Sequence, residues 1–433
     1  MDLTLSSLHR SVDSPTSESM NLLNEIGEDF PEAISFAAGK PFEGFLSLDS
    51  VHEYLDAFRA RLTGRLGMSE EQVARRVLQY GSARGIINDL VARHLEVDER
   101  IRVSPEEIVV TSGCQEALYL VLRALRGRSG DAVLTVRPTY SGLDAAAQLV
   151  DMPVLSVDEP ADGIDGAHLT RAVDEARGQG YRPRALYVMP DFANPTGRSL
   201  TLEARESLLA AAAECGILLL EDNPYGNFGP EGEHLPTLKS LDQSRCVVYL
   251  GSFAKSGLPG ARVGYVVADQ NVTEGDRSGS LLADQITRLK GMLSINTSPI
   301  AQAVIGGKIL LNDFSLRRAN ERERAVYQEN LECLLVSFEE NFPEVHGERL
   351  HGVSFNTPRG GFFMSVTLPF ASTDDILRLC GEKYGVLWTP MHHFHGDGIP
   401  RNEIRFAFSH LSREQIRLGV QRFSAFVADH ADR

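Results

Sequence analysis

The sequence is poor in cysteine, and none of its 5 cysteines forms a C-x-x-C pair with another. Disulfide frameworks and zinc sites depend on such spacings, so neither is expected, and this usage is typical of a reducing compartment. Long apolar runs are also missing: no stretch approaches the ~18 residues that span a bilayer, and the N-terminus lacks the apolar core of a signal peptide. We therefore expect a cytoplasmic protein with no membrane partner.

Basic residues are outnumbered: Lys and Arg total 43 against 59 Asp and Glu, and the formal net charge is −16. A chain of this sign repels phosphate backbones, so no nucleic-acid partner is expected. A small anionic substrate would have to be held by individual arginines. With 433 residues, of which 42% are hydrophobic, the chain can bury a large core and is expected to fold as two domains.

Short apolar runs alternate with helical patterns between about residues 108 and 267. The runs are almost continuously apolar, which is typical of strands covered on both faces. This alternation predicts an α/β fold with a doubly wound, mostly parallel sheet. The predicted strands are 107–110, 132–136, 185–188, 217–220 and 247–250, and the predicted helices are 115–126, 142–150, 169–179 and 202–214.

The pattern changes near residue 310, where a long charged helix pattern leads into strand-like segments of alternating polarity. This mixture predicts a smaller α+β domain. We place the large domain at 46–319 and the small domain at 320–433, and we expect the N-terminal segment 1–45 to pack with the small domain. The predicted helices are 317–341, 373–383 and 412–428, and the predicted strands are 353–356, 361–368, 385–389 and 403–409.

The run Gly251–Arg262 places Lys255 between a turn of small residues and an arginine seven positions later. This arrangement suits an amine that forms a Schiff base beside a bound phosphate. Pyridoxal 5′-phosphate carries both groups, and it acts as an electron sink when a carboxylate faces its protonated ring nitrogen. A site for this cofactor predicts further partners upstream of Lys255, one for each part of the molecule.

Three upstream residues suit the cofactor ring. Asp222 follows the predicted strand 217–220, at the sheet edge where α/β folds bind ligands, and could face the ring nitrogen. Tyr225 and Asn194 could each hydrogen-bond the phenolic oxygen of the ring. Plainer explanations stay open for each residue taken alone, because an aspartate after a strand often caps a helix and the run Asn194–Gly197 is by itself a good turn.

The phosphate of the cofactor needs hydrogen-bond donors and positive charge. Gly113, Cys114 and Gln115 lie between a predicted strand and an apolar helix, where free N–H groups and the helix dipole favour an anion. Ser252 and Arg262 could add a hydroxyl and a charged contact. Taken alone, Ser112 and Gly113 are better explained as a helix cap with a tight turn.

Tyr140 follows a predicted strand and could stack on the cofactor ring, although a tyrosine at the rim of the core would look the same. The combination favours the cofactor. A helix-terminus anion site, a stacking aromatic, an amide, a carboxylate and a lysine follow one order on consecutive βα turns.

On these residues the chain resembles the fold-type I, class I/II pyridoxal phosphate-dependent aminotransferases over almost its whole length. The resemblance implies that Gly39 lines the substrate pocket, that Asn194 also contacts the substrate and that Arg405 binds the substrate α-carboxylate. It also implies a homodimer in which Tyr80 reaches the phosphate in the neighbouring subunit's site. The segments that carry the resemblance are 34–39, 78–81 with Gly85, 194–197, 222–226, 252–262 and 405–409.

A narrower resemblance involves the segments 190–194, 222–226, 289–299 and 385–395. They look like those of the hydroxyphenylglycine and dihydroxyphenylglycine aminotransferases of peptide-antibiotic biosynthesis. The segment 385–395 contains His392, His393 and His395, but no carboxylate nearby in the sequence matches them and their spacing is not i, i+4. We therefore expect no metal, and we interpret this segment as a loop that lines the substrate pocket.

The resemblance implies transamination between an amino acid and a 2-oxo acid, with an arylglycine as the product and Lys255, Asp222 and Tyr225 as the catalytic residues. Other reactions stay open, because the same fold and cofactor serve lyases, synthases and amino-acid oxidases. A transaminase for another non-proteinogenic or a general aromatic amino acid is also consistent. An aminotransferase-like transcription regulator would need a DNA-binding domain, whereas the matching segments already begin within the first forty residues, which are acidic in net charge.

Overall fold

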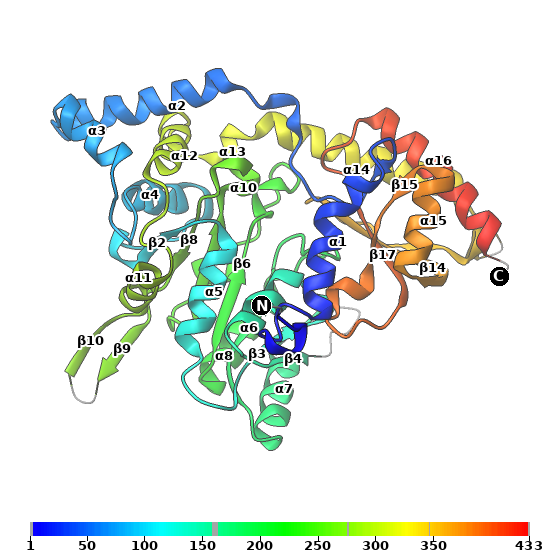
Figure 1. The fold of residues 1–433 in the computed structure, drawn as a ribbon, viewed down its shortest axis with the longest axis horizontal. Coiled ribbons are helices and arrows are strands. Elements are labelled where there is room, and N and C mark those ends of the chain that lie inside the picture. Colours follow the sequence, from blue (N-terminus) through cyan, green and yellow to red (C-terminus); the bar gives the residue numbers. More distant parts are fainter. Residues whose placement is uncertain (1–2, 158–162, 275–276, 346, 432–433) are drawn as a thin grey trace.

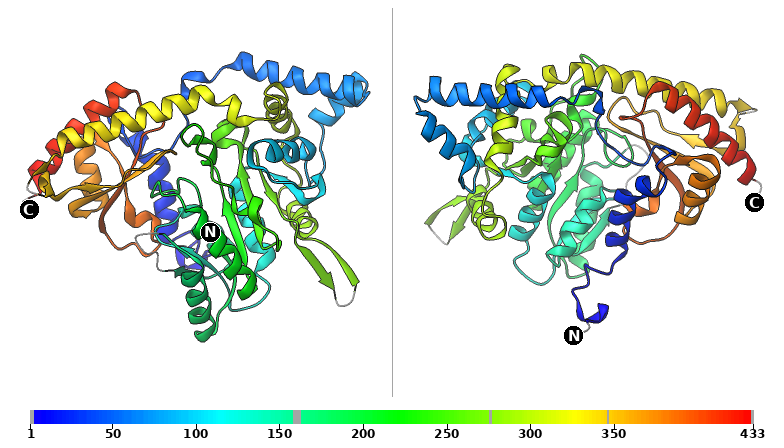
Figure 2. Two further views of the ribbon diagram at one scale, coloured as in Figure 1. Left: turned by 180° about the vertical axis from the view of Figure 1, so that it is seen from behind. Right: turned by 45° about the horizontal axis from the view of Figure 1, so that its top comes forward.

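A seven-stranded sheet and a smaller four-stranded sheet organise the protein in the computed structural model, which describes residues 3–157, 163–274, 277–345 and 347–431. The two sheets lie in separate parts of the molecule (Figure 1). The long helix α14 (Glu321–Asn341) runs from one part to the other in both views of Figure 2.

The large sheet has the strand order β2-β8-β7-β6-β5-β3-β4, and β8 is antiparallel to both of its neighbours while the other pairs are parallel. The predicted mostly parallel α/β sheet is confirmed. The strands β4 and β8 are not among the strands predicted from the sequence; β4 lies at the edge of the sheet and only its last residue, Val157, is buried. The strands are β2 (Ile108–Thr111), β3 (Asp131–Val136), β4 (Val154–Val157), β5 (Arg182–Val188), β6 (Leu218–Asp222), β7 (Val247–Ser252) and β8 (Gly264–Val267).

Helices cover both faces of this sheet, so successive strand residues enter different cores. Leu219 packs with residues of α7 and α8, whereas Leu220 packs with residues of α5 and α6. Among the described helices, none combines the length and the apolarity that crossing a bilayer requires. A hairpin of β9 (Asn271–Glu274) and β10 (Arg277–Leu281) projects from this part of the molecule (Figure 1). The helices of this part are α2 (Leu48–Ala60), α3 (Glu70–Leu78), α4 (Asn88–Glu99), α5 (Cys114–Leu125), α6 (Ser141–Leu149), α7 (Gly166–Gly178), α8 (Leu202–Cys215), α9 (Leu238–Leu241), α10 (Phe253–Ser256), α11 (Leu282–Leu293) and α12 (Pro299–Leu311).

The smaller sheet has the order β13-β14-β17-β16 and packs against α14, α15 and α16. The predicted helix 317–341 is broken, because α13 (Leu316–Ala319) ends at Asn320, whose side chain donates to the Leu316 and Ser256 carbonyls. The remaining elements are α15 (Asp374–Tyr384), α16 (Arg413–His430), β11 (Glu344–Val345), β12 (Glu348–Arg349), β13 (Ser354–Phe355), β14 (Phe363–Ser372), β15 (Val386–Leu387), β16 (Thr389–Pro390) and β17 (Arg401–Ala407).

The N-terminal segment contacts both parts. Helix α1 (Pro15–Asp29) lies against α6 and against the short helix η8 (Met391–Phe394). The strand β1 (Ile34–Ser35) pairs in parallel with β15, and Ile26 and Phe36 enter the core of the smaller part. The domain limits proposed from the sequence stay a prediction.

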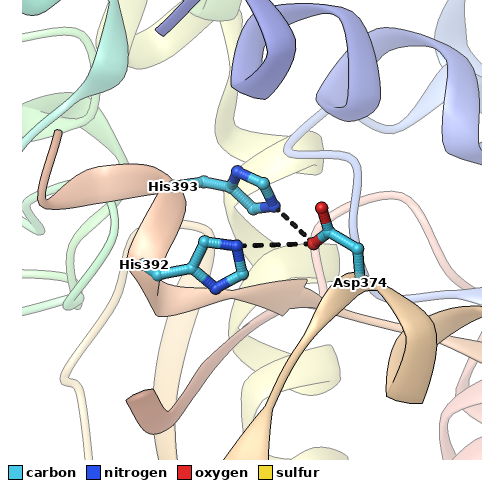
Figure 3. A group of neighbouring side chains, drawn as sticks. All are labelled: Asp374, His392 and His393. Carbon is cyan, nitrogen blue, oxygen red and sulfur yellow. Dashed lines mark hydrogen bonds and ion pairs between the residues drawn. The ribbon is translucent and has the colours of Figure 1, made fainter. Parts of the chain in front are cut away.

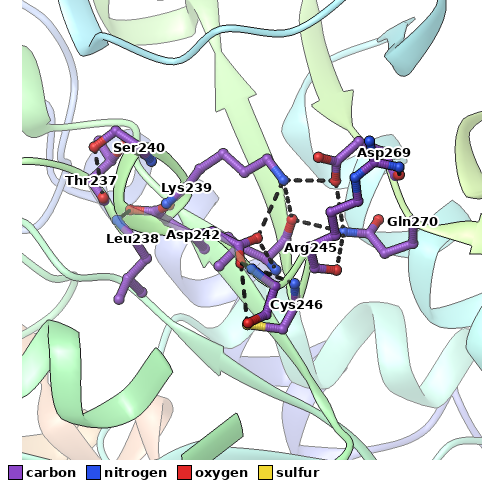
Figure 4. A network of polar contacts seen from close by, with 12 residues as sticks. Thr237, Leu238, Lys239, Ser240, Asp242, Arg245, Cys246, Asp269 and Gln270 are labelled. Carbon is purple, nitrogen blue, oxygen red and sulfur yellow. Dashed lines mark hydrogen bonds and ion pairs between the residues drawn. The ribbon is translucent and has the colours of Figure 1, made fainter. Parts of the chain in front are cut away.

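Buried ion pairs fix the loops between the strands. The ammonium of Lys239 donates to Asp269 (2.7 Å), to the Val247 carbonyl (3.0 Å) and to Asp242 (3.5 Å) (Figure 4). The Glu221 carboxyl, whose pKa burial raises to about 8, accepts the backbone N–H groups of Leu238 and Lys239. These contacts fasten α9 to the ends of β6 and β7.

Arg205 on α8 is completely buried and anchors the chain that leaves β5. Its guanidinium lies 2.5 Å from Asp191 and donates to the Pro190 carbonyl at 3.0 Å. Asp191 stands just before the turn Asn194–Gly197. This ion pair therefore positions that turn.

We predict that Arg205→Met lowers the free energy of unfolding by about 3–5 kcal/mol, because it leaves the Asp191 carboxylate buried without its cation. Adding Asp191→Asn should recover part of the loss. Denaturant unfolding of the variants measures both effects, and the exposed Arg171→Met is the control. Equal stability of the Arg205 and Arg171 variants would contradict the prediction.

Candidate active site

Lys255 stands on the short helix α10, directly after β7. Its ammonium donates to the Gly39 carbonyl at 2.7 Å, and Ser252 caps the helix by accepting from the Ala254 N–H (3.2 Å). Burial, with the positive charges of Arg405 and Arg262, lowers the pKa of Lys255 to about 8. A substantial neutral fraction of this amine is therefore available near neutral pH.

Asp222 is the last residue of β6 and is 3% exposed. Its carboxylate accepts the Tyr187 hydroxyl at 2.7 Å and the Cys114 thiol at 3.5 Å. Burial raises its pKa to about 6, and the two hydrogen bonds oppose that rise. Tyr187 was not predicted as a site residue, because a tyrosine within an apolar predicted strand looks like an ordinary core residue.

The start of α5 lies against Arg262. Gly113 precedes the helix with φ of 84°, and a Cβ at this position would lie 2.8 Å from the Arg262 guanidinium. The side chains of Cys114 and Gln115 are already engaged, with Asp222 and with the Gly142 carbonyl (2.7 Å). Both residues therefore offer only their first-turn backbone N–H groups to an anion.

Tyr140 directly precedes α6 and lies near the same charges. Burial raises the pKa of its phenol, as do the charges of Asp222 and Cys114, while Arg262 acts in the opposite direction. The predicted ring-stacking residue, the carboxylate and the arginine thus occupy one neighbourhood.

Arg405 on β17 joins the two parts of the molecule. It donates to the Asn194 side-chain oxygen at 2.7 Å and to the Ala37 carbonyl at 2.5 Å. Its guanidinium lies over the rings of Phe363 (4.5 Å) and Phe394 (4.8 Å). Burial lowers its pKa to about 10, and its Nε has no hydrogen-bond partner among the described residues.

The turn that carries Asn194 needs glycine at Gly197. This residue has φ of 70°, and a Cβ would lie 2.2 Å from the Phe363 carbonyl oxygen. The close approach seats the turn on β14, beside Arg405. Tyr225 is buried nearby, its ring edge-on to Phe363 at 5.4 Å, and burial raises the pKa of its phenol.

Of two further predicted site residues, Gly39 contacts Lys255 and Tyr80, by its described contacts, does not reach the site within the same chain. Gly39 contributes its carbonyl to Lys255, and a Cβ on it would lie 2.5 Å from the Phe363 ring. Tyr80 is 79% exposed, and no described contact joins it to the residues above.

The segment 385–395, here called the histidine loop, lies beside a carboxylate that was not predicted to be near it. Asp374, at the start of α15, lies 2.8 Å from His393 and 3.4 Å from His392 (Figure 3). His392 stands 18 positions after Asp374, so only the fold brings them together. The loop also touches the chain before Tyr140, where the Thr139 N–H donates to the Phe394 carbonyl at 2.9 Å.

The donor set fits pyridoxal 5′-phosphate. A helix N-terminus with an arginine suits the phosphate, a buried carboxylate suits the ring nitrogen, and a lysine with a lowered pKa suits the aldehyde. The buried Gln115 Oε1 and Arg405 Nε, both without partners among the described residues, are atoms that a polar ligand could satisfy.

Comparisons with known proteins agree with this geometry. The family model described as aminotransferase class I and II matches residues 59–423. The (S)-3,5-dihydroxyphenylglycine transaminase of Amycolatopsis orientalis is 51% identical, covering 98% of this chain and 94% of that protein.

Two solved structures are similar over nearly the whole chain. The kynurenine aminotransferase of Pyrococcus horikoshii, in complex with PMP, has a TM-score of 0.79 at 25% identity, covering 96% of this chain and 94% of that one. The α-aminoadipate aminotransferase of Thermus thermophilus, complexed with N-(5′-phosphopyridoxyl)-L-leucine, has a TM-score of 0.77 at 26% identity, covering 99% of both chains. The chain therefore belongs to the aminotransferase class I and II family and is a pyridoxal phosphate-dependent aminotransferase.

Proposed function

We propose that this enzyme forms an arylglycine-type amino acid, hydroxyphenylglycine or dihydroxyphenylglycine, by transferring an amino group from a donor amino acid to an arylglyoxylate. The observation that carries the proposal is the 51% identity, over 98% of the chain, to a dihydroxyphenylglycine transaminase. Supply of a building block for a peptide antibiotic is the corresponding physiological role.

Aromatic side chains around the lysine support an aryl substrate. The Lys255 ammonium lies 5.7 Å from the Phe362 ring centroid and 6.0 Å from that of Tyr225. Phe363 and Phe394 flank Arg405. A planar apolar group between such rings gains both burial and ring–ring contact.

When bound, the cofactor supplies an aldehyde for covalent capture of amines and a conjugated ring that accepts the electron pair released at the substrate Cα. The Lys255 amine would hold this aldehyde and, when free, would act as the base that takes the substrate Cα proton and as the acid that gives it back. Its lowered pKa provides the neutral amine that both tasks need.

Asp222 holds a proton on the ring nitrogen through its carboxylate, and Tyr187 and Cys114 keep that carboxylate oriented. Tyr225 and Asn194 donate to the phenolic oxygen of the ring. These roles are supported by the burial of Asp222, Tyr187, Tyr225 and Asn194 at or near the carboxyl ends of β5 and β6, where charge interactions are strong.

Arg405 binds the substrate carboxylate with its planar guanidinium. The two phenylalanine rings fix the plane of that group, and Asn194 accepts from one of its nitrogens. The backbone N–H groups at the start of α5, the Ser252 hydroxyl and Arg262 would hold the phosphate, and Tyr140 would pack against the ring.

We also propose a cytoplasmic homodimer. Large apolar side chains are exposed on, or just after, helices α2, α3 and α11, and exposed apolar surface of this kind marks contact surfaces. Helix α12 packs on both α2 and α3. The five cysteines are free, as a reducing compartment requires. The exposed residues are Leu48 (80%), Leu78 (73%), Tyr80 (79%), Met292 (77%) and Ile295 (58%).

Acceptor preference tests the proposed substrate class. We predict that arylglyoxylates exceed the corresponding arylpyruvates about 10- to 200-fold in kcat/KM, because a pocket fitted to the shorter acid must accommodate an extra methylene. Holoenzyme is assayed with phenylglyoxylate, 4-hydroxyphenylglyoxylate, 3,5-dihydroxyphenylglyoxylate, phenylpyruvate and 2-oxoglutarate, with tyrosine as donor. A preference for phenylpyruvate indicates a general aromatic aminotransferase instead, whereas oxygen uptake or net ammonia release refutes transamination.

The lowered pKa of Lys255 sets a pH dependence. Because the folded-state pKa lies near 8, well below its ordinary value of 10.5, the amine becomes neutral as the pH rises through about 8. We predict that the rate at which cofactor-free protein captures pyridoxal phosphate, followed by visible absorbance, reaches half its maximum near that pH. Lys255→Ala should show no visible adduct. An inflection near pH 10 would contradict the assigned environment of the amine.

Complementation between subunits tests the proposed role of Tyr80. We predict that Tyr80→Ala weakens cofactor affinity and that Lys255→Ala abolishes activity. A dimer of one variant chain with the other has one site with both native residues only if Tyr80 acts on the partner's site. Mixed dimers should therefore regain cofactor affinity and about half of the native turnover. No recovery in a mixture that sedimentation shows to be dimeric places Tyr80 in its own subunit's site or outside any site.

A further inference from the structure

Two adjacent histidines and a carboxylate converge in the small domain, apart from the residues assigned to the reaction. His392 and His393, on η8, both direct Nε2 at the same Asp374 oxygen, Oδ1 (Figure 3). The candidate ligand atoms all lie within 4.8 Å of one another. Two imidazole nitrogens and a carboxylate oxygen form a ligand set typical of zinc.

The two imidazoles are buried and one of them is anchored from behind. His392 is 9% exposed and His393 is 6% exposed. The other ring nitrogen of His393, Nδ1, lies 2.7 Å from the hydroxyl of Ser19, a buried residue of α1. Metal-binding histidines are usually held in this way, by a hydrogen bond that fixes the ring orientation and leaves the second nitrogen free.

His392 supplies a separate observation. Its Nδ1 is buried and has no hydrogen-bond partner among the described residues, so its Nε2 contact at 3.4 Å is the one polar interaction described for this ring. Its described polar contacts therefore hold the ring only through the Nε2 atom that faces the carboxylate. A cation between the three side chains would bind both Nε2 atoms and the carboxylate together.

We propose that Asp374, His392 and His393 bind a divalent transition-metal ion of the zinc class. Ligand atoms on a tetrahedral zinc ion lie about 3.3 Å apart, given bonds of about 2.0–2.1 Å. The observed separations of 2.8 and 3.4 Å from Asp374 Oδ1 need only small side-chain rotations to reach that value. The Asp374 side chain is 43% exposed, which gives the ion a route from solvent and leaves a coordination position for water.

A bound ion would tie three segments together. It joins the start of α15 to η8, and through Ser19 it also holds α1. The same short helix η8 accepts the Thr139 N–H through Phe394, one residue before Tyr140. The site therefore stabilises the loop beside the reaction centre without contacting the reacting atoms. It departs from the expectation of no metal, which rested on the lack of a matching carboxylate in the sequence.

Metal titration of the holoenzyme, prepared without a histidine tag, tests the site. Co²⁺ is followed by its visible d–d absorption and Zn²⁺ by calorimetry and by the thermal midpoint. We expect one ion per chain, a higher midpoint with Zn²⁺, and at least about tenfold weaker binding in Asp374→Asn and in His393→Gln. Asp374→Asn is nearly isosteric at a half-exposed position, so its folding is not in question.

Matched variants separate this site from incidental binding. His168→Gln breaks another His–Asp pair, with Asp165 at 2.6 Å, that lacks a second histidine, and it should leave metal binding unchanged. Ser19→Ala should weaken binding about 10-fold, and Ser19→Thr should restore it because the hydroxyl remains. Absence of saturable binding, or equal binding by the native protein and Asp374→Asn, overturns the proposal and identifies a hydrogen-bonded cluster.

Discussion

The contact between Arg405 and Asn194 is the interaction on which the rest of the site depends. It is made by two buried side chains, one from the small sheet and one from the turn after β5, so it forms only when both parts of the chain are folded and apposed. A buried guanidinium without partners would be costly, and the Ala37 carbonyl and the Asn194 oxygen offset that cost. The cation proposed to bind substrate therefore also joins the two parts of the molecule.

Burial tunes the neighbouring groups in opposite directions. It raises the pKa of Asp222 and lowers the pKa of Lys255, because a dry environment disfavours any charge. Before the cofactor binds, the pKa values of both groups therefore lie closer to 7 than their ordinary values do. A cationic ring nitrogen would favour the ionised carboxylate, and a neutral amine is the form that reacts with an aldehyde. The same physical effect prepares the two residues for complementary tasks.

Partners behind the predicted site residues are as important as the residues themselves. Tyr187 orients Asp222, Phe363 and Phe394 hold the Arg405 guanidinium, and Gly197 lets the Asn194 turn approach β14. Helix α1 adds a link of a different kind, since it contacts α6 and, through Ser19, the histidine loop. The site is a junction of five or more segments that are distant in the sequence.

The sequence alone determined the large α/β sheet and the family, because continuous apolar runs and residues at strand ends are local signals. Lys255, Asp222, Tyr225 and Asn194 could be proposed in this way, one turn after another. Only the tertiary structure brought Tyr187 to Asp222 and Asp374 to the histidines. Those contacts join residues with no short-range pattern between them, and a hydroxyl within an apolar strand or an aspartate at a helix start is unremarkable until the chain has packed.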